Sequence, residues 1–186
     1  MRYNPAKHHR RSMRLKGYDY TQNGAYFVTI VVQNRTCLFG KVVDGIMQLN
    51  VAGQMIDREW HALPTRFPNV HLDAFVVMPN HIHGIIILTN APPAGAPLVG
   101  AQNGVAPNGV APTVPLGAVV GAYKSLTTVE FTRGVKTLGW PPFPGKLWQR
   151  NYHERIVRDD AALNRIRRYI EENPARWAAD TENPVR

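Results

Sequence analysis

The chain has 186 residues, 44% of them hydrophobic, and its 22 Lys and Arg against 13 Asp and Glu give a formal net charge of +9. This length can bury one hydrophobic core and is too short for two large domains. The positive balance is typical of proteins that meet phosphate groups, and no apolar stretch approaches the roughly 20 residues of a membrane span. The single cysteine, Cys37, excludes an intramolecular disulfide and a multi-cysteine zinc module, so a reducing cytoplasm is the expected location.

Basic residues dominate the first 24 positions, where Asp19 is the first acidic residue. No apolar segment follows the first basic residues, so we do not expect a signal peptide. We interpret residues 1–24 as a basic arm. The arm is either an ordinary solvated tail or a segment that binds phosphates through Arg10, Arg11 and Arg14.

Local patterns predict the elements of the first half of the chain. Asp44-Gly45 is a strong hairpin-turn signal, and Asn50 is suited to cap a helix that ends before Pro64. Apolar, β-forming runs mark the strands. These signals predict strands at 25–33, 70–78 and 81–88, a hairpin at 41–49 and a helix at 52–63.

Residues 90–117 are rich in Ala, Pro, Gly and Val, and the pentapeptide at 103–107 is repeated at 108–112. A segment without charges and with a Pro every few residues cannot build its own core, so we interpret it as a flexible linker. The linker interrupts a single domain at 25–178, and residues 179–186 are interpreted as a C-terminal tail.

Two helices are predicted after the linker. In the first, Tyr123 faces inward while Lys124 faces solvent. The second begins near Asp159-Asp160, whose carboxylates suit a helix N-terminus, and buries Leu163, Ile166 and Ile170. The stretch 146–155 between them is interpreted as a basic aromatic block.

His81 and His83 open the strand at 81–88, and their spacing places both imidazoles on one face of it. Two imidazoles on one face can share a cation. They also interrupt an apolar strand, which costs free energy unless a metal, hydrogen bonds or water offsets it. The alternative to a metal site is a half-exposed pair of histidines whose ring nitrogens are hydrogen-bonded to the protein or to water.

Tyr169 and Asn173 lie one turn apart on the last helix, with Arg165 one turn before Tyr169 and Arg168 next to it. A phenol flanked by guanidinium groups is an unusual choice for packing alone. Tyr169 could still be a boundary aromatic, and Asn173 before Pro174 could be only a cap.

Together these motifs resemble those of the REP-associated tyrosine transposases, which are relatives of the single-tyrosine HUH transposases of insertion sequences. The motifs occur in the family's order and cover nearly the whole chain except the linker. The segments that carry the resemblance are Arg11–Tyr20, Ala25–Thr29, His81–His83, Ala122–Ser125, Leu147–Tyr152 and Tyr169–Pro174.

The resemblance implies an α+β fold, with one antiparallel sheet carrying helices on one face in a ferredoxin-like arrangement and the histidines on the other side. It implies that His81, His83 and Asn173 hold a divalent metal, Mg²⁺ or Mn²⁺. It also implies that Tyr169 is the nucleophile that cleaves single-stranded, hairpin-forming repetitive DNA through a covalent 5′-phosphotyrosine. The residues expected to bind DNA are Arg10, Arg11, Arg14, Lys124, Arg150, Arg165 and Arg168. The chain departs from the family at His153, where relatives often carry a second aromatic; this puts local contacts in doubt, and His153 could approach the site.

Chemistry supports the same assignment. A phenol with a pKa of about 10 is a poor nucleophile at neutral pH until positive charge favours the phenolate. No nucleotide cofactor is needed, because one phosphate ester replaces another. Relatives in insertion sequences are dimers that deliver the tyrosine in trans, whereas REP-associated ones look monomeric, so a monomer is favoured and a dimer is the alternative.

Two other classes of function compete. A DNA-hairpin-binding protein without turnover could use the basic arm and the region of Trp148 and Tyr152. A zinc hydrolase lacks support, because the other histidines form no H-E-x-x-H or similar spacing.

Overall fold

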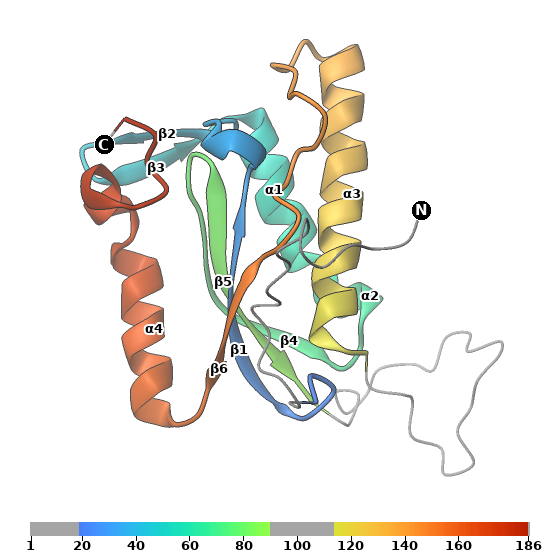
Figure 1. Ribbon diagram of the computed structural model, residues 1–186, viewed down its shortest axis with the longest axis vertical. Helices are drawn as coiled ribbons and strands as arrows, with labels where there is room; N and C mark the ends of the chain where they lie inside the picture. Colours follow the sequence, from blue (N-terminus) through green and yellow to red (C-terminus); the bar gives the residue numbers. More distant parts are fainter. Residues whose placement is uncertain (1–18, 90–113, 186) are drawn as a thin grey trace, which may run out of the picture.

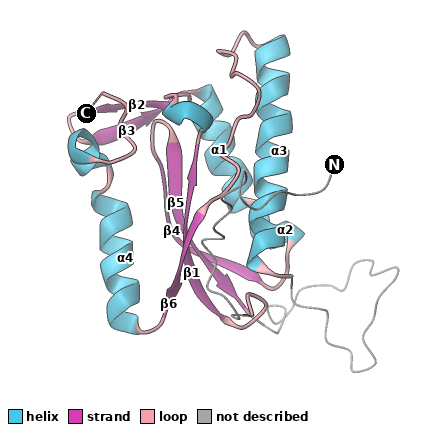
Figure 2. Ribbon diagram, in the orientation of Figure 1, coloured by secondary structure: helices cyan, strands magenta, loops and turns pink. Residues whose placement is uncertain are grey.

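The structure is a computed structural model that describes residues 19–89 and 114–185, in which helices pack on a central antiparallel sheet (Figures 1 and 2). Its elements in chain order are β1 (Gly24–Val31), η1 (Gln33–Arg35), β2 (Gly40–Val43), β3 (Ile46–Leu49), α1 (Val51–His61), α2 (Leu63–Arg66), β4 (Val70–Val77), β5 (His81–Leu88), α3 (Leu116–Thr137), β6 (His153–Val157), α4 (Asp160–Glu172) and η2 (Pro174–Ala179). No helix among these residues is long and apolar enough to cross a membrane.

The sheet has the strand order β4-β5-β1-β6, and every neighbouring pair is antiparallel. Strand β1 reaches β4 through α1, and β5 reaches β6 through α3, so each connection skips one strand. This is the split β-α-β topology of ferredoxin-like folds. The predicted α+β class and ferredoxin-like arrangement are therefore confirmed.

Helices cover both faces of this sheet, which corrects the expected placement of all helices on one face. In Figure 1, α1 and α3 lie on one side of the sheet and α4 lies on the other. Ile166 and Ile170 of α4 pack with Ile85 and Phe27 on the second side. The histidines therefore lie beneath a helix-covered face rather than on an open one.

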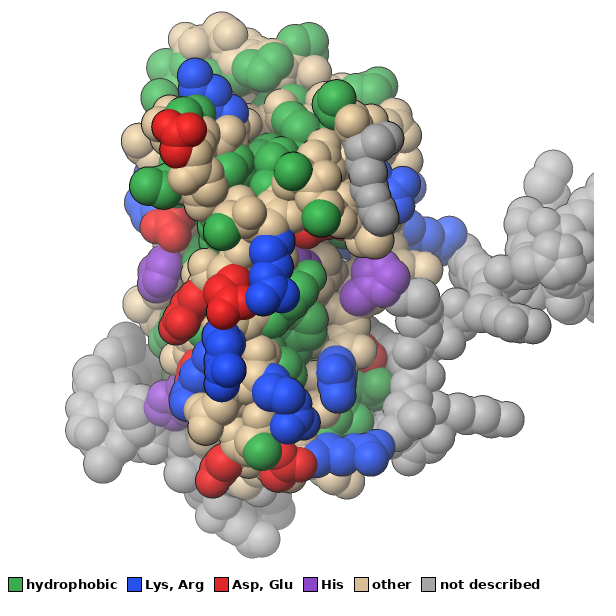
Figure 3. Space-filling model, turned by 90° about the vertical axis from the view of Figure 1, so that its left-hand side faces the viewer, with side chains coloured by type: hydrophobic (Ala, Val, Ile, Leu, Met, Phe, Trp, Pro, Cys, Tyr) green, Lys and Arg blue, Asp and Glu red, His purple; other side chains and the backbone are tan. Residues whose placement is uncertain are grey.

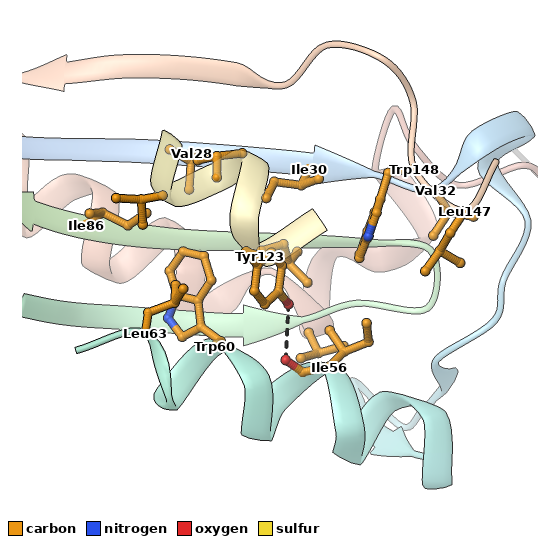
Figure 4. Packing of buried hydrophobic residues seen from close by; sticks show 14 of the residues in the cluster. Val28, Ile30, Val32, Ile56, Trp60, Leu63, Ile86, Tyr123, Leu147 and Trp148 are labelled. Atoms are coloured by element: carbon orange, nitrogen blue, oxygen red, sulfur yellow. Dashed lines mark hydrogen bonds between the residues drawn. The ribbon is translucent and has the colours of Figure 1, made fainter. Parts of the chain in front are cut away.

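The main core fills the space between the sheet and the pair α1 and α3 (Figure 4). The Tyr123 hydroxyl donates a hydrogen bond of 3.0 Å to the Ile56 carbonyl, which ties α3 to α1. Trp60 stacks on Phe75 with ring centroids 4.5 Å apart. A Cβ on Gly84 would lie 2.3 Å from the Trp60 ring, so this strand position requires glycine.

Short-range signals account for several elements. Asp44 and Gly45 both have positive φ, 51° and 75°, as a two-residue hairpin turn requires. The Asn50 side chain accepts a 2.8 Å hydrogen bond from Gly53 N at the start of α1, and Asp159 accepts one of 2.6 Å from Ala162 N at the start of α4. The predicted strands, hairpin and helix caps are confirmed at these positions.

The structure differs from the prediction at the end of the linker and at one further strand. Leu116 and Gly117 belong to α3, so the predicted linker does not extend to 117. Strand β6 (His153–Val157) lies where the sequence indicates only a basic aromatic block. It forms a strand by pairing with β1, which is distant in the sequence. The rest of the linker (90–113) and the arm up to 18, including Arg10, Arg11 and Arg14, lie outside the described residues.

An ion pair fastens α4 to the sheet. A register shift in β4 between Leu72 and Phe75 interrupts the ladder next to Asp73. Arg167 of α4 donates two hydrogen bonds to the Asp73 carboxylate, 2.8 Å to Oδ1 and 2.6 Å to Oδ2. These bonds lower the pKa of Asp73, although burial opposes the shift.

Replacing Arg167 by Gln is expected to lower the Tm at pH 7 by no more than about 2–4 °C, because solvent screens this half-exposed pair. Because the pKa of Asp73 is lower in the folded state, the stabilisation is present above the unfolded-state pKa of about 3.9 and disappears as the pH falls through the folded-state pKa. Thermal melts should therefore show a difference at pH 7 that shrinks below about pH 4.

Arg168→Gln is the matched control, because Arg168 is exposed on the same helix and has no ion pair within the described ranges. An equal fall in Tm for both variants would show that the Asp73 pair does not fasten the helix.

Candidate metal and nucleophile site

The two histidines converge at the start of β5. His81 and His83 point to the face covered by α4, and their Nε2 atoms lie 3.1 Å apart. Both side chains are buried, with 0% and 4% of the residue exposed. The alternative of a half-exposed pair is therefore excluded.

Hydrogen bonds hold both rings from behind. Asn80 donates from Nδ2 to the carbonyls of Arg35 (2.8 Å) and Glu182 (2.7 Å), so its Oδ1 is the atom that accepts from His81 Nδ1 at 2.9 Å. His83 Nδ1 lies 2.8 Å from the Thr29 hydroxyl. A proton on each Nδ1 leaves both Nε2 lone pairs facing one another, as metal-binding histidines require.

The charge state of the pair also suits a cation. Burial lowers the pKa of His81 to about 4, while Asp180 and Glu182 oppose the shift. Burial also holds the pKa of His83 well below its ordinary value, and positive charge on His81 and His153 adds to this. Both rings are neutral at pH 7, and two facing Nε2 lone pairs are stable only with a proton or a cation between them.

Tyr169 of α4 reaches the histidine pair from the side. Its hydroxyl lies 3.4 Å from His83 Nε2, and its ring meets Phe27 edge-on at 6.0 Å while Phe27 stacks on His83 at 5.4 Å. Burial raises the pKa of Tyr169, the charge on Asp180 raises it further, and a hydrogen bond from the Asn173 side chain opposes both effects. Tyr169 is still 40% exposed, so this residue combines contact with the pair and access from solvent.

Asn173 lies at the end of α4 and is 2% exposed. Its side chain makes no capping hydrogen bond to η2, which removes the support for a purely capping role. Its Oδ1 is buried without a hydrogen-bond partner within the described residues. A buried amide oxygen without a partner costs free energy, and a cation at the histidine pair would satisfy it.

An acidic donor, Asp180, comes from the segment predicted to be a tail. One Asp180 oxygen lies within 4.8 Å of the ligand atoms of His81 and His83, and Asp180 Oδ2 is 4.0 Å from His81 Nε2. Together these three residues could hold a divalent metal. Sequence reasoning missed Asp180, because nothing near it in the sequence links it to the histidines.

Long-range contacts bring the chain around Asp180 to the site. Glu182 forms an ion pair of 2.7 Å with Arg35, and its carbonyl accepts the bond from the buried Asn80. The Trp177 ring lies 6.0 Å from the His81 ring. Residues 177–182 therefore pack against the turn between β4 and β5 instead of extending as a tail.

The four predicted DNA-binding residues that the structure describes divide into two groups. Arg150, Arg165 and Arg168 are exposed. Lys124 instead donates to the carbonyls of Gln149 (2.7 Å) and Arg150 (3.0 Å), so it holds the chain before β6 rather than projecting into solvent. Figure 3 views the molecule from the side of α4 and shows Lys and Arg side chains spread over this face.

Trp148 corrects one part of the alternative interpretation. It is 3% exposed, donates a 2.9 Å hydrogen bond from Nε1 to Thr127 Oγ1 and tilts against Phe39. It is a core residue and cannot stack on a base.

Comparison with known proteins supports this fold and identifies a relative. A Haemophilus influenzae protein, named only as an uncharacterized protein, is 37% identical over 179 residues, which is 96% of both chains. The chain belongs to the family of this Haemophilus protein. No family model matches the chain.

Among solved structures, that of a REP-associated tyrosine transposase bound to a REP hairpin is similar in fold. Its TM-score is 0.55, its sequence identity is 17%, and the match covers 88% of this chain and 73% of that one. At this identity the likeness concerns the fold.

Proposed function

We propose that the protein is a metal-dependent endonuclease and strand transferase for single-stranded DNA, with Tyr169 as its nucleophile. The observation that carries the proposal is the 3.4 Å contact between the Tyr169 hydroxyl and Nε2 of His83, which itself lies 3.1 Å from Nε2 of His81. A solvent-accessible phenol beside two neutral, converging imidazoles is suited to phosphoryl transfer.

The residues present fit a divalent cation. His81 and His83 would hold it through Nε2, the Asn173 oxygen would gain the partner it lacks, and Asp180 would add negative charge. The cation would supply positive charge that favours the phenolate and polarises the phosphodiester. Thr29 and Asn80 would keep the two rings oriented.

The proposed reaction exchanges one phosphate ester for another. The Tyr169 oxygen bonds to phosphorus while the bond from phosphorus to the 3′ oxygen breaks. The phenolic proton leaves Tyr169, and the departing strand takes up a proton as it becomes a free 3′-hydroxyl. Because the ester is conserved in the 5′-phosphotyrosine, a 3′-hydroxyl can reverse the step and join strands.

The Tyr169 hydroxyl contacts His83 of its own chain, which supports attack in cis by a monomer. The substrate class rests on analogy of fold with the REP-associated tyrosine transposase. By that analogy we propose hairpin-forming repetitive sequences as the DNA that the protein recognises.

One observation favours the second candidate, a DNA-hairpin-binding protein without turnover. His81 is 0% exposed and Asp180 only 8% exposed on its side chain, so this conformation offers little access to a phosphodiester at Nε2. A binding protein would need no such access.

Covalent trapping separates the two candidates. The protein is incubated with labelled hairpin oligonucleotides from the DNA that flanks its gene, with Mn²⁺ or with EDTA. We expect a labelled, denaturation-resistant protein–DNA species that requires the metal. Binding without this species in either buffer would support the second candidate.

A further inference from the structure

Strand β6 extends the site beyond the histidines. Its register with β1 pairs His153 with Thr29 and Arg155 with Phe27. On its other side β1 pairs Thr29 with His83. His83, Thr29 and His153 therefore form one row across three strands, and Arg155 lies in the next row beside Phe27.

The side chains of His153 and Arg155 on β6 point to the face of the sheet that carries Tyr169. Directly paired residues of antiparallel strands share a face of the sheet. Phe27 contacts the rings of His83 and Tyr169, and Val157, two residues after Arg155, packs against the α4 cluster. Because side chains alternate along a strand, His153 and Arg155 lie on the same face as Val157.

Arg165 of α4 completes the set. Arg167 is turned toward β4, where it binds Asp73, and helical geometry places Arg165 about 200° from Arg167 around the helix axis. Arg165 therefore lies on the other side of α4, which is the side of Tyr169 four residues later. Since α4 contacts both β4 and β6, this side is the one nearer β6.

The basic side chains on this strip are available to a ligand. His153, Arg155 and Arg165 are exposed, and none has an ion pair within residues 19–89 and 114–185. By contrast, the Arg167 and Arg176 guanidiniums of the same region pair with Asp73 and Glu172. Unpaired guanidinium groups beside a proposed nucleophile are suited to phosphate oxygens.

We propose that His153, Arg155 and Arg165 form a basic strip that binds the phosphates next to the phosphodiester attacked by Tyr169. This proposal rests on the proposed function for the identity of the scissile bond. Within its row, His153 on β6 lies two strand spacings, about 10 Å, from His83 on β5. The strip would thus hold the neighbouring part of the single strand and set which phosphodiester meets Tyr169.

A binding experiment tests the strip without cleavage. The probe is a fluorescein-labelled oligothymidine of about 20 nucleotides, longer than the usual single-strand sites. Arg155→Gln and Arg165→Gln should each weaken binding and reduce the slope of log Kd against log salt concentration by about 0.7, the value for one single-strand phosphate contact. Arg155→Lys should restore the slope.

Arg58→Gln is the matched control, since Arg58 is 63% exposed on α1, on the opposite side of the sheet. It should leave both affinity and slope unchanged. Parental affinity and slope in the Arg155→Gln, Arg165→Gln double variant would overturn the strip.

Chemical substitution then tests position. In the hairpin oligonucleotide that the parent cleaves, each phosphate beside the scissile one is replaced in turn by a neutral methylphosphonate. At one of these positions the methylphosphonate should raise the KM of the parent. It should not raise the KM of Arg155→Gln further, because that variant has already lost the contact with this phosphate. Equal losses in both proteins at every position would overturn the phosphate contact.

The two proposals fail in different ways. If the parent forms no covalent species yet the oligothymidine slopes change as stated, the proposed function is wrong and the basic strip stands. If the parent cleaves and the Arg155→Gln, Arg165→Gln variant cleaves with parental KM, the strip is wrong and the nucleophile assignment stands.

Discussion

Tyr169→Phe is expected to abolish the metal-dependent covalent species and reduce DNA nicking by about three orders of magnitude or more, as losses of catalytic nucleophiles do. Only the attacking oxygen is removed. The Phe ring can keep the edge contacts that Tyr169 makes with Phe27 and His83. Hairpin affinity should therefore stay within severalfold of the parent, and so should Tm.

Tyr152→Phe is a useful control, because it removes a hydroxyl from a half-buried tyrosine that packs against the main core and not beside the histidines. It should still form the covalent species. Undiminished nicking by Tyr169→Phe would instead assign the attack to another group, such as water, and would return Tyr169 to a packing role between α4 and the sheet.

The parts of the fold that the sequence predicts are those with short-range causes. The Asp44-Gly45 turn, the Asn50 cap and the apolar runs of β1 and β5 each depend on neighbours a few residues away. The sequence does not reveal β6, because its partner β1 lies more than a hundred residues earlier and its three consecutive polar residues, His153–Arg155, lack the alternation that marks a strand.

The candidate site also has a part that the sequence predicts and a part that it does not. The spacing of His81 and His83 on a strand is visible in the sequence, and so is the turn that separates Tyr169 from Asn173 on a helix. Their convergence needs α4 to lie on the histidine face, which the Asp73 ion pair and the Ile166 cluster determine.

Asp180 and the residues behind the rings are the unpredicted part. Thr29 and Asn80 orient His83 and His81, and Asp180 approaches only because Glu182 is tied to Asn80 and Arg35. A single carboxylate outside any helix or strand gives no periodic signal in the sequence. Three-dimensional contacts alone distinguish it from a solvated tail.

Replacing both His81 and His83 by Ala is expected to remove Mn²⁺ binding, measured by calorimetry, and with it all nicking. No other pair of nitrogen ligands lies at this position among the residues that the structure describes. The exposed His61 on α1 provides the control, and His61→Ala should bind Mn²⁺ as the parent does. Unchanged affinity in the double variant would place the metal elsewhere.

Asn173 and Asp180 can then be ranked as additional ligands. Asn173→Ser should weaken Mn²⁺ binding by about tenfold or more, since the shorter side chain cannot carry its oxygen to the site occupied by the buried Oδ1. Asp180→Asn keeps an acceptor oxygen but loses the negative charge beside His81, so it should weaken binding by a similar factor. If Asn173→Ser binds Mn²⁺ and cleaves at limiting metal as fast as the parent, Asn173 only orients Tyr169, and Asp180 is left as the oxygen donor next to the two imidazoles.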